Sequence, residues 1–419
     1  MIRNVNRDVT LVTIGGLISI ALSYCFWLTA SYLYDSEEIG LTTVLISSVI
    51  LIATLSNLGV AATYLTVLPQ SNPSNISVDD AVSSGIISSI ALGSICSLML
   101  VLFLPDALGV LSNWSNLAFV WALTFTFSTL FAVDRIADTL LLTSARTRLL
   151  PKKQLLLGIS RILILVSMTA VTAQTGVLAS WALGLGASTV VIWGVFLRGY
   201  VRPRITNPIK VFDFMVQSLS MNVSNLSINL FPIVALWVGS VVSVLRWGPE
   251  AAGEFFILWM VGAFSLMLPR TYSVVITVDR GESPGGNFDQ VRNGFFISVG
   301  CGTLIGLAAY FVLPLFSGMF GGLLLLNTMA WGLTSAPGYV VHYFVAKWRV
   351  LRKPVALFLV PIIAVAIFGI FLNHPLADSS QSGVVWLGAL SAMALGSWVF
   401  DYILADGEAN DEIFIGRNI

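Results

Sequence analysis

The chain consists mainly of long hydrophobic runs separated by short polar stretches. About twelve runs are long enough to cross the roughly 30 Å hydrocarbon core of a bilayer as helices of about 20 residues. In the first half, the predicted helices cover residues 9–33, 40–68, 81–104, 117–143, 153–174 and 176–198. In the second half, they cover residues 211–242, 252–278, 291–314, 319–344, 354–373 and 383–404. The pattern predicts an all-α integral membrane protein.

Composition agrees with this prediction. The 419 residues are 57% hydrophobic and only 10% charged, and the mean hydropathy is +0.90, which is outside the usual range of a soluble domain. Twelve helices with short loops use almost the whole chain, so we expect no large extramembrane domain. Basic and acidic residues balance, so the net charge does not indicate a nucleic-acid partner.

The positions of the basic residues predict the orientation of the helices. Arg135, Arg161 and Arg270 lie within predicted helices. Nearly all the other basic residues fall at the termini or in loops on the same side as the N-terminus, and only Arg246 lies in a loop on the opposite side. Because cytoplasmic loops carry an excess of Lys and Arg, we expect a plasma-membrane protein with both termini in the cytoplasm. Residues 405–419 are expected to form a flexible acidic cytoplasmic tail.

A short motif occurs once in each half of the chain. Residues 35–40 (Asp-Ser-Glu-Glu-Ile-Gly) open the second predicted helix, and residues 248–253 (Gly-Pro-Glu-Ala-Ala-Gly) open the eighth. Each copy has a Glu three residues before a Gly, and the same offset brings the third predicted helix near the ninth. This internal repeat predicts two six-helix halves, residues 1–204 and 205–404, related by a pseudo-twofold axis along the membrane normal.

The residues around the first motif resemble those of a known family. Residues 32–41 (Tyr-Leu-Tyr-Asp-Ser-Glu-Glu-Ile-Gly-Leu) and 55–60 (Leu-Ser-Asn-Leu-Gly-Val) are similar to the opening of polysaccharide flippases of the O-antigen transporter type. In that family, a Gly-Pro-Glu-x-Tyr-Gly-like turn precedes a Leu-Gly-hydrophobic-Gly-like stretch. This chain departs from the pattern in having Ser36, Ile39 and Ala61 where Pro, Tyr and a second Gly are common.

These flippases are members of the multidrug/oligosaccharidyl-lipid/polysaccharide (MOP) exporter superfamily. The resemblance implies a transporter that moves a polyprenyl-(pyro)phosphate-linked oligosaccharide across the plasma membrane by alternating access, for surface polysaccharide biosynthesis. It also implies contacts with membrane lipids and with other polysaccharide-assembly proteins. It implies no cofactor.

Two of the arginines within helices have carboxylates as possible partners. An ionised side chain at bilayer depth costs at least ~2.5 kcal/mol and usually faces protein or water. Asp134 and Asp138 share one face of a helix. Asp138 and Arg161 are both about 12 Å from the inner surface at 1.5 Å per residue, so they could pair. The sequence leaves two interpretations open: a structural ion cluster that includes Arg135, or a site at which Asp134 and Asp138 bind a coupling proton or cation.

Arg270 differs because its predicted helix supplies no acidic neighbour within a turn or two. The planar guanidinium fork can bind phosphate oxygens in a bidentate manner. The alternative is a guanidinium that reaches the membrane surface or bonds to backbone carbonyls. Under the family resemblance, Arg270, Arg161 and Arg135 would line a cavity that binds the pyrophosphate of the lipid-linked sugar.

Several asparagines add polar candidates to this cavity. Ser218, Asn222, Asn225 and Asn229 fall on one face of the helix predicted at 211–242. Their amides either bond across to other helices or line a wet cavity that contacts sugar hydroxyls. Asn57, within the second family motif, belongs to the same candidate cavity.

Two other functions stay open. A multidrug and toxin extrusion-type exporter shares the superfamily architecture, but such exporters handle mostly cationic substrates. An integral-membrane polysaccharide polymerase or ligase would need a long outer loop with catalytic groups, and every predicted outer loop here is short. We therefore expect a transporter and not an enzyme. The two His and three Cys residues do not have metal-ligand spacing, so no metal site is expected.

Overall fold

The structure is a computed structural model of the chain. It describes residues 5–67, 77–103, 117–144, 146–169, 176–200, 208–267, 269–271, 288–315, 325–350 and 382–415. Every regular element within these ranges is helical, and none of the described residues is in a strand. The prediction of an all-α, multi-pass membrane protein is confirmed.

Seven α-helices form the first half of the chain. They are α1 (Val5–Leu33), α2 (Ser36–Asn57), α3 (Val60–Val67), α4 (Val78–Phe103), α5 (Leu117–Thr143), α6 (Leu150–Met168) and α7 (Gly176–Val191). A short 3-10 turn, Thr147–Leu149, precedes α6, and a π-helical turn, Ile192–Phe196, extends α7. Each predicted hydrophobic run therefore forms helix, although the run at 40–68 is divided between α2 and α3.

Six further α-helices form the described part of the second half. They are α8 (Pro208–Trp247), α9 (Pro249–Ser265), α11 (Phe288–Val312), α12 (Leu325–Leu333), α13 (Ser335–Val350) and α15 (Ser382–Ile415). The helix predicted at 354–373 lies outside the described residues. In the described part of the chain, eight helices are long and apolar enough to cross a membrane. Helix α15 continues past Leu404 to Ile415, so those residues of the predicted tail are helical.

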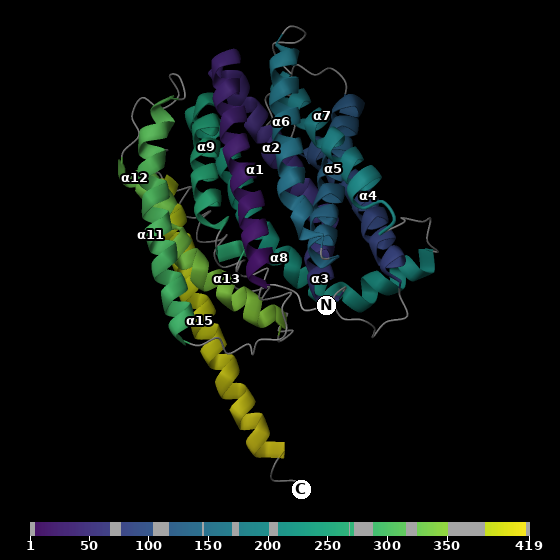
Figure 1. Cartoon of the computed structure of the whole chain (residues 1–419), viewed down its shortest axis with the longest axis vertical. Coiled ribbons are helices and arrows are strands. Elements are labelled where there is room, and N and C mark those ends of the chain that lie inside the picture. Colours follow the sequence, from purple (N-terminus) through teal and green to yellow (C-terminus); the bar gives the residue numbers. More distant parts are fainter. Residues whose placement is uncertain are drawn as a thin grey trace.

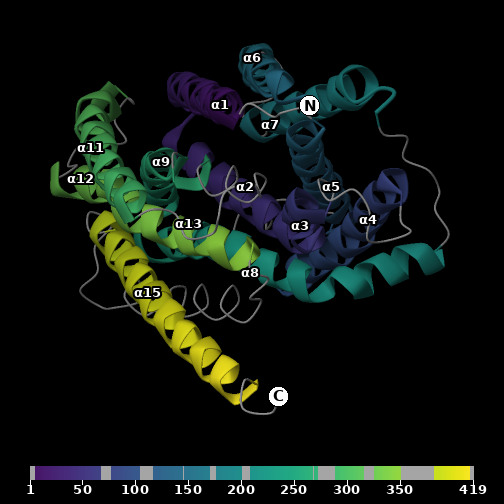
Figure 2. The same ribbon diagram turned by 60° about the horizontal axis from the view of Figure 1, so that its bottom comes forward.

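The helices form two groups that correspond to the predicted halves (Figures 1 and 2). One group contains α1 to α7, and the other contains α9, α11, α12, α13 and α15. The groups meet where α1 and α2 pack against α9 and where α2 packs against α8. At this interface, the rings of Trp27 and Phe256 lie 5.0 Å apart. The predicted architecture of two six-helix halves is confirmed.

Helix α8 contacts both groups. At 40 residues it is much longer than the roughly 20 residues that cross a bilayer. Its first part packs on the N-terminal half, where Phe214 lies 6.2 Å from Tyr64 between ring centroids. Further along, the indole of Trp237 donates a hydrogen bond to Ser48 of α2 at 2.9 Å. Figure 2 shows α8 extending from the second group to α3 and α4.

The boundary between α2 and α3 is a backbone turn that the hydrophobic pattern does not reveal. Leu58 and Gly59 both have positive φ, 47° and 74°. A Cβ atom on Gly59 would lie 2.2 Å from the carbonyl oxygen of Asn222 and 2.6 Å from the amide nitrogen of Leu226, both on α8. Only glycine allows the two backbones to approach so closely. The sequence prediction of one continuous helix at 40–68 is wrong for this reason.

The helix predicted at 319–344 is also divided. Helix α12 ends at Leu333, Thr334 lies in a turn, and α13 begins at Ser335. Pro337 lies in the first turn of α13, where its missing N–H removes no intrahelical hydrogen bond. Pro337 is therefore compatible with a helix that begins at Ser335, directly after the break.

Candidate functional site

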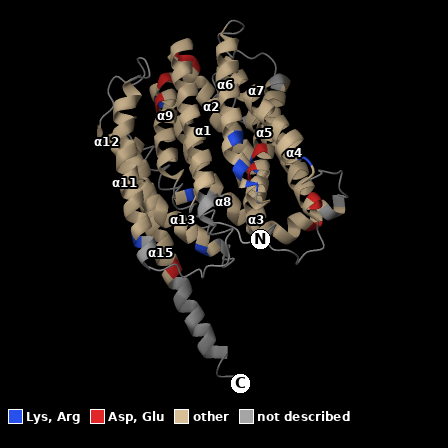
Figure 3. Cartoon of the chain, in the orientation of Figure 1, with Lys and Arg blue, Asp and Glu red and all other residues tan. Residues whose placement is uncertain are grey.

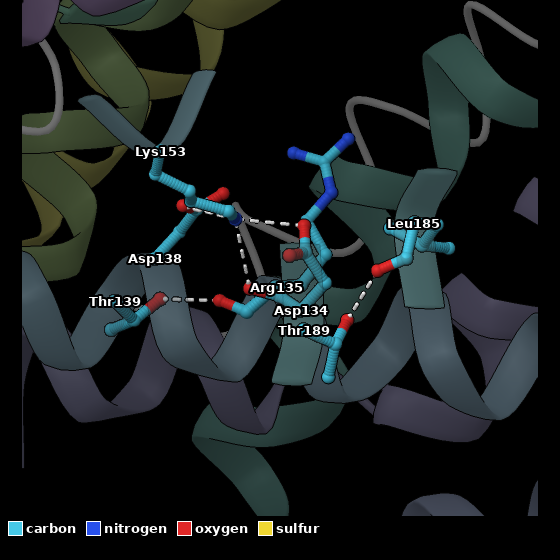
Figure 4. Close-up of polar contacts among 7 residues, drawn as sticks. All are labelled: Asp134, Arg135, Asp138, Thr139, Lys153, Leu185 and Thr189. Atoms are coloured by element: carbon cyan, nitrogen blue, oxygen red, sulfur yellow. Dashed lines mark hydrogen bonds and ion pairs between the residues drawn. The ribbon is translucent and has the colours of Figure 1, made fainter. Parts of the chain in front are cut away.

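Basic and acidic residues lie close together on α5 and α6 (Figure 3). The Nζ atom of Lys153 lies 2.8 Å from Oδ2 of Asp134 and 2.5 Å from Oδ1 of Asp138. It also donates to the backbone carbonyl of Asp134 at 3.4 Å. An ammonium group has three donors. Each donor of Lys153 thus has an acceptor on α5 (Figure 4).

Local structure brings these three residues together. Asp134 and Asp138 are one helical turn apart on α5, and their carboxylates point toward the same neighbour. A short connection joins α5 to α6, and Lys153 lies in the first turn of α6. The side chain of Lys153 is 0% exposed, and those of Asp134 and Asp138 are 8% and 24% exposed. A buried charge without a partner is strongly destabilising, so this pairing is what allows the ammonium of Lys153 to be buried between α6 and α5.

The predicted partner of the carboxylates is wrong. The sequence suggested that Asp138 could pair with Arg161 and placed Lys153 at the cytoplasmic start of the helix predicted at 153–174. Instead, both carboxylates bond to Lys153, which is a buried residue of α6. Sequence spacing contained a signal for this pair, since Asp138 lies five residues before the end of α5 and Lys153 lies three residues after the start of α6. Antiparallel helices joined by a short loop bring such positions to the same depth.

Arg161 binds an aromatic ring in place of a carboxylate. Its Cζ atom lies 4.2 Å from the ring centroid of Trp181 on α7, in a cation–π contact. Its Nε atom is buried and has no hydrogen-bond partner. The side chain borders a small cavity of about 20 Å³ together with Ser19, Ser23 and Gln154. That volume is enough for about one water molecule.

Arg135 lies against the other ring of the same aromatic pair. Its Cζ atom is 5.0 Å from the ring centroid of Phe131, and Phe131 stacks on Trp181 at 5.7 Å. Unlike the carboxylate of its neighbour Asp134, the side chain of Arg135 is exposed. Among the described residues, nothing forms a hydrogen bond or ion pair with this guanidinium. Its donors are therefore available to a ligand.

Arg270 belongs to the second half, and charges of the cluster in the first half act on it. Its side chain is exposed, and its charge interacts with those of Arg135 and Asp138. In the described part of the chain, its guanidinium likewise has no hydrogen bond or ion pair. The structure thus brings together three of the predicted site residues, Arg135, Asp138 and Arg270, from both halves of the molecule.

The asparagines of α8 are buried against the break between α2 and α3. Asn225 donates from Nδ2 to the hydroxyl of Thr63 on α3 at 3.2 Å, and Asn222 donates to Ser218 one turn away at 2.8 Å. Asn222 and Asn225 are both 0% exposed. For these two residues, the geometry supports bonding within and between helices over contact with a wet cavity. Asn229 is half-buried.

Asn57 has a local structural role. Its Oδ1 atom accepts a hydrogen bond from the backbone N–H of Ala61 at 3.1 Å, so it caps the start of α3. The Nδ2 atom of Asn57 is buried and has no hydrogen-bond partner, and the same is true of the Oδ1 atom of Asn222. Asn57 therefore stabilises the turn that Gly59 makes possible.

The two copies of the sequence repeat meet each other at one end of the bundle, where α2 and α9 begin. The hydroxyl of Ser36 donates to Oε1 of Glu250 at 2.8 Å. A Cβ atom on Gly40 would lie 1.8 Å from the carbonyl oxygen of Pro249, so the backbones are in close contact. We refer to this contact between Ser36, Gly40, Pro249 and Glu250 as the α2–α9 closure. It joins the two halves at the end that the charge pattern predicts to be external.

The described residues contain no group of three or more His, Cys, Asp or Glu side chains that could hold a metal ion. Asp134 and Asp138 are the two carboxylates of the charged cluster, and Lys153 already bonds to both.

The chain matches no protein-family model and no curated protein sequence. It does match solved transporter structures along almost its whole length. A MATE transporter from Vibrio cholerae superposes with a TM-score of 0.63 at 13% identity, covering 96% of each chain. An inward-facing multidrug resistance MATE family transporter of the MOP superfamily superposes with a TM-score of 0.62 at 11% identity, covering 95% of each.

A third solved structure is a MOP superfamily transporter from Pyrococcus furiosus. It has a TM-score of 0.58 at 12% identity and covers 96% of each chain, and reverse polarity of its binding pocket suggests a different function for it. At such low identities these likenesses establish the fold. The fold is similar to that of these MATE and MOP superfamily transporters, which is the architecture that the family resemblance in the sequence implied.

Proposed function

We propose that the chain is a MOP-type exporter that moves its substrate across the membrane by alternating access of its two halves. One observation carries the proposal. Arg135 of the first half and Arg270 of the second, which the sequence predicts to lie within membrane-spanning helices, are exposed, and the charge of one acts on the other. Charged side chains within a membrane usually face a water-filled path or a substrate. In transporters built from two repeats, the substrate site lies between the repeats.

The α2–α9 closure supports an alternating mechanism. At that end of the bundle, the halves touch through a hydrogen bond and a backbone contact. Separation of these contacts, together with those of α2 along α9 and α8, would open the interface at this end without unfolding either half. In the predicted orientation, both termini lie on the cytoplasmic side of the plasma membrane. The α2–α9 closure then lies on the outer side of the membrane, and the arginines are reached from the cytoplasm.

The substrate class has two candidates. The similar solved structures include multidrug resistance and other MATE transporters, so they favour a drug or metabolite exporter over a lipid-linked oligosaccharide flippase. The flippase has its own support in the residues 32–41 and 55–60. It would take a polyprenyl-(pyro)phosphate-linked glycan and act beside other polysaccharide-assembly proteins.

The charge of the site favours an anionic group on the substrate of either exporter. Lys153 already bonds to the carboxylates of Asp134 and Asp138, whereas the guanidinium groups of Arg135 and Arg270 have no hydrogen bond or ion pair among the described residues. Guanidinium binds carboxylate and phosphate oxygens through two parallel hydrogen bonds. A cationic substrate would meet net repulsion here.

Transport by purified protein in proteoliposomes tests this proposal. We expect anionic amphiphilic solutes to be carried and cationic dyes to be rejected. Arg270→Ala should reduce anion transport roughly ten- to hundredfold, the equivalent of one lost charge-assisted hydrogen-bonded contact of about 1.5–3 kcal/mol. Arg270→Lys should give an intermediate rate, because it keeps the charge but loses the planar fork. The control is Arg246→Ala, which removes an exposed arginine at the end of α8.

The two substrate classes separate in cells that lack the gene. If surface polysaccharide disappears from the envelope and returns with the wild-type gene but not with Arg270→Ala, the flippase is supported. Unchanged polysaccharide together with increased sensitivity to toxic anions would support the drug or metabolite exporter. Transport of cations by the purified protein at rates unaffected by Arg270→Ala would contradict the anion-binding role.

A further inference from the structure

Lys153 is bound as a small cation is bound in a protein. Its ammonium lies among three oxygen atoms, one from each carboxylate and one from the backbone carbonyl of Asp134. Carboxylate and carbonyl oxygens are the ligands that hard metal cations prefer. A fourth oxygen, Oδ1 of Asp134, is buried and lacks a hydrogen-bond partner. The α5 helix therefore supplies a cation position, and a side chain of α6 fills it.

The surroundings oppose exchange of this ammonium for a dissolved cation. The charges of Arg135 and Arg161 act on Asp134, and that of Arg270 acts on Asp138. A cation that displaced Lys153 would leave a fully buried ammonium without a partner, which is strongly destabilising. Three guanidinium groups would also repel it.

We propose that Lys153 is a built-in cation that fills the position between α5 and α6, so that Asp134 and Asp138 do not bind Na⁺ or K⁺ in this protein. A coupling metal ion, if transport uses one, binds elsewhere. Lys153 thereby determines which ions the site excludes. The inference goes beyond the proposed function, and its test measures cation binding and not transport.

The Lys153→Ala variant tests the proposal, since it leaves the four oxygens of Asp134 and Asp138 without the ammonium. Thermal unfolding of purified protein is compared in NaCl, KCl and N-methylglucamine chloride at equal ionic strength, together with binding of radioactive ²²Na⁺. For wild type we expect the same unfolding temperature in all three salts and no saturable ²²Na⁺ binding. For Lys153→Ala we expect a lower temperature in N-methylglucamine chloride, a partial recovery in NaCl or KCl, and saturable binding.

Two further variants are controls. Lys152→Ala removes the neighbouring lysine, whose side chain is exposed, and should behave as wild type. Lys153→Ala combined with Asp134→Asn removes the central carboxylate and should lose the cation-specific recovery. If Lys153→Ala does not fold, Lys153→Ala with Asp138→Asn removes one charge of each sign and keeps Asp134, and the same comparison applies to it.

Either of two results would overturn the proposal. One is saturable ²²Na⁺ binding by wild type that Asp134→Asn abolishes, because the site would then accept a cation beside Lys153. The other is a folded variant without Lys153 that shows no cation-specific stabilisation and no ²²Na⁺ binding. Neither result depends on whether the protein transports an anion, so failure of the proposed function would leave this test unaffected.

Discussion

Gly184 determines how closely α6 and α7 approach beside Arg161. A Cβ atom on Gly184 would lie 2.5 Å from Cγ of Arg161 and 3.1 Å from its Cα and backbone nitrogen. The guanidinium can therefore reach the ring of Trp181 on the same helix as Gly184. The absence of a side chain at Gly184 thus allows the charge of Arg161 to take its position. The hydrophobic pattern of the sequence does not predict this contact.

We predict that Gly184→Ala destabilises the protein. The backbone atoms of Arg161 cannot move aside as a flexible side-chain end would, so the two helices must separate, and overpacking of this kind costs about 1–3 kcal/mol. Gly186→Ala on the same helix is the matched control, because its Cβ atom would find its nearest neighbour, Cδ1 of Leu130, at 3.9 Å. Thermal unfolding in detergent is the measurement. Equal unfolding temperatures for the two variants would contradict the assigned role of Gly184.

The charged cluster shows what the sequence could and could not predict about the site. Two carboxylates one turn apart on a hydrophobic helix were enough to predict a shared face for Asp134 and Asp138. Their partner was missed because a lysine near a helix end looks like a cytoplasmic loop residue when loop charges are counted. Whether Lys153 turns inward depends on how α5 and α6 pack, which is a property of two helices and not of one.

At the scale of helices, the hydrophobic pattern predicts which segments are helical and fails where a helix breaks. The runs that became α1, α4 and α5 were predicted almost to their ends. The break between α2 and α3 was not, since its cause lies in α8, more than 150 residues away in sequence. Gly59 and Leu58 interrupt the helix so that the turn can lie against the backbone of Asn222 and Leu226.

Two glycines with similar backbone angles allow the cost of this contact to be measured. Gly59 has φ +74° and touches α8, whereas Gly199 has φ +76° and, among the described residues, no atom within 4 Å of its Cβ position. In each variant, the left-handed backbone at the alanine lowers the free energy of unfolding by about 1–2 kcal/mol. We predict that Gly59→Ala costs a further 1–3 kcal/mol for its clash with α8. Unfolding of both variants by heat gives the difference directly, and similar losses would show that φ alone requires glycine at position 59.

For the whole molecule, the two copies of the internal repeat have a structural role that the sequence did not indicate. Residues 35–40 and 248–253 were expected to occupy equivalent places in two halves. In the structure, these equivalent segments contact each other, as segments near a twofold axis can. The repeat therefore both relates the halves and joins them. At this end the contact includes one side-chain hydrogen bond and one close backbone approach, and an alternating mechanism requires both to break and reform in each transport cycle.

We predict that locking the α2–α9 closure stops transport. Ser36→Cys and Glu250→Cys are introduced together, with Cys25, Cys96 and Cys301 replaced by Ala, and a short thiol-specific crosslinker joins the two positions. If the halves must separate at this end, the crosslinked double variant should lose nearly all transport in proteoliposomes, and a crosslinker cleavable by reduction should restore it. The single-cysteine variants treated in the same way are the controls. Full transport by quantitatively crosslinked protein would mean that the substrate does not leave between α2 and α9. The path that contains the exposed arginines would then reach the outer side at another place.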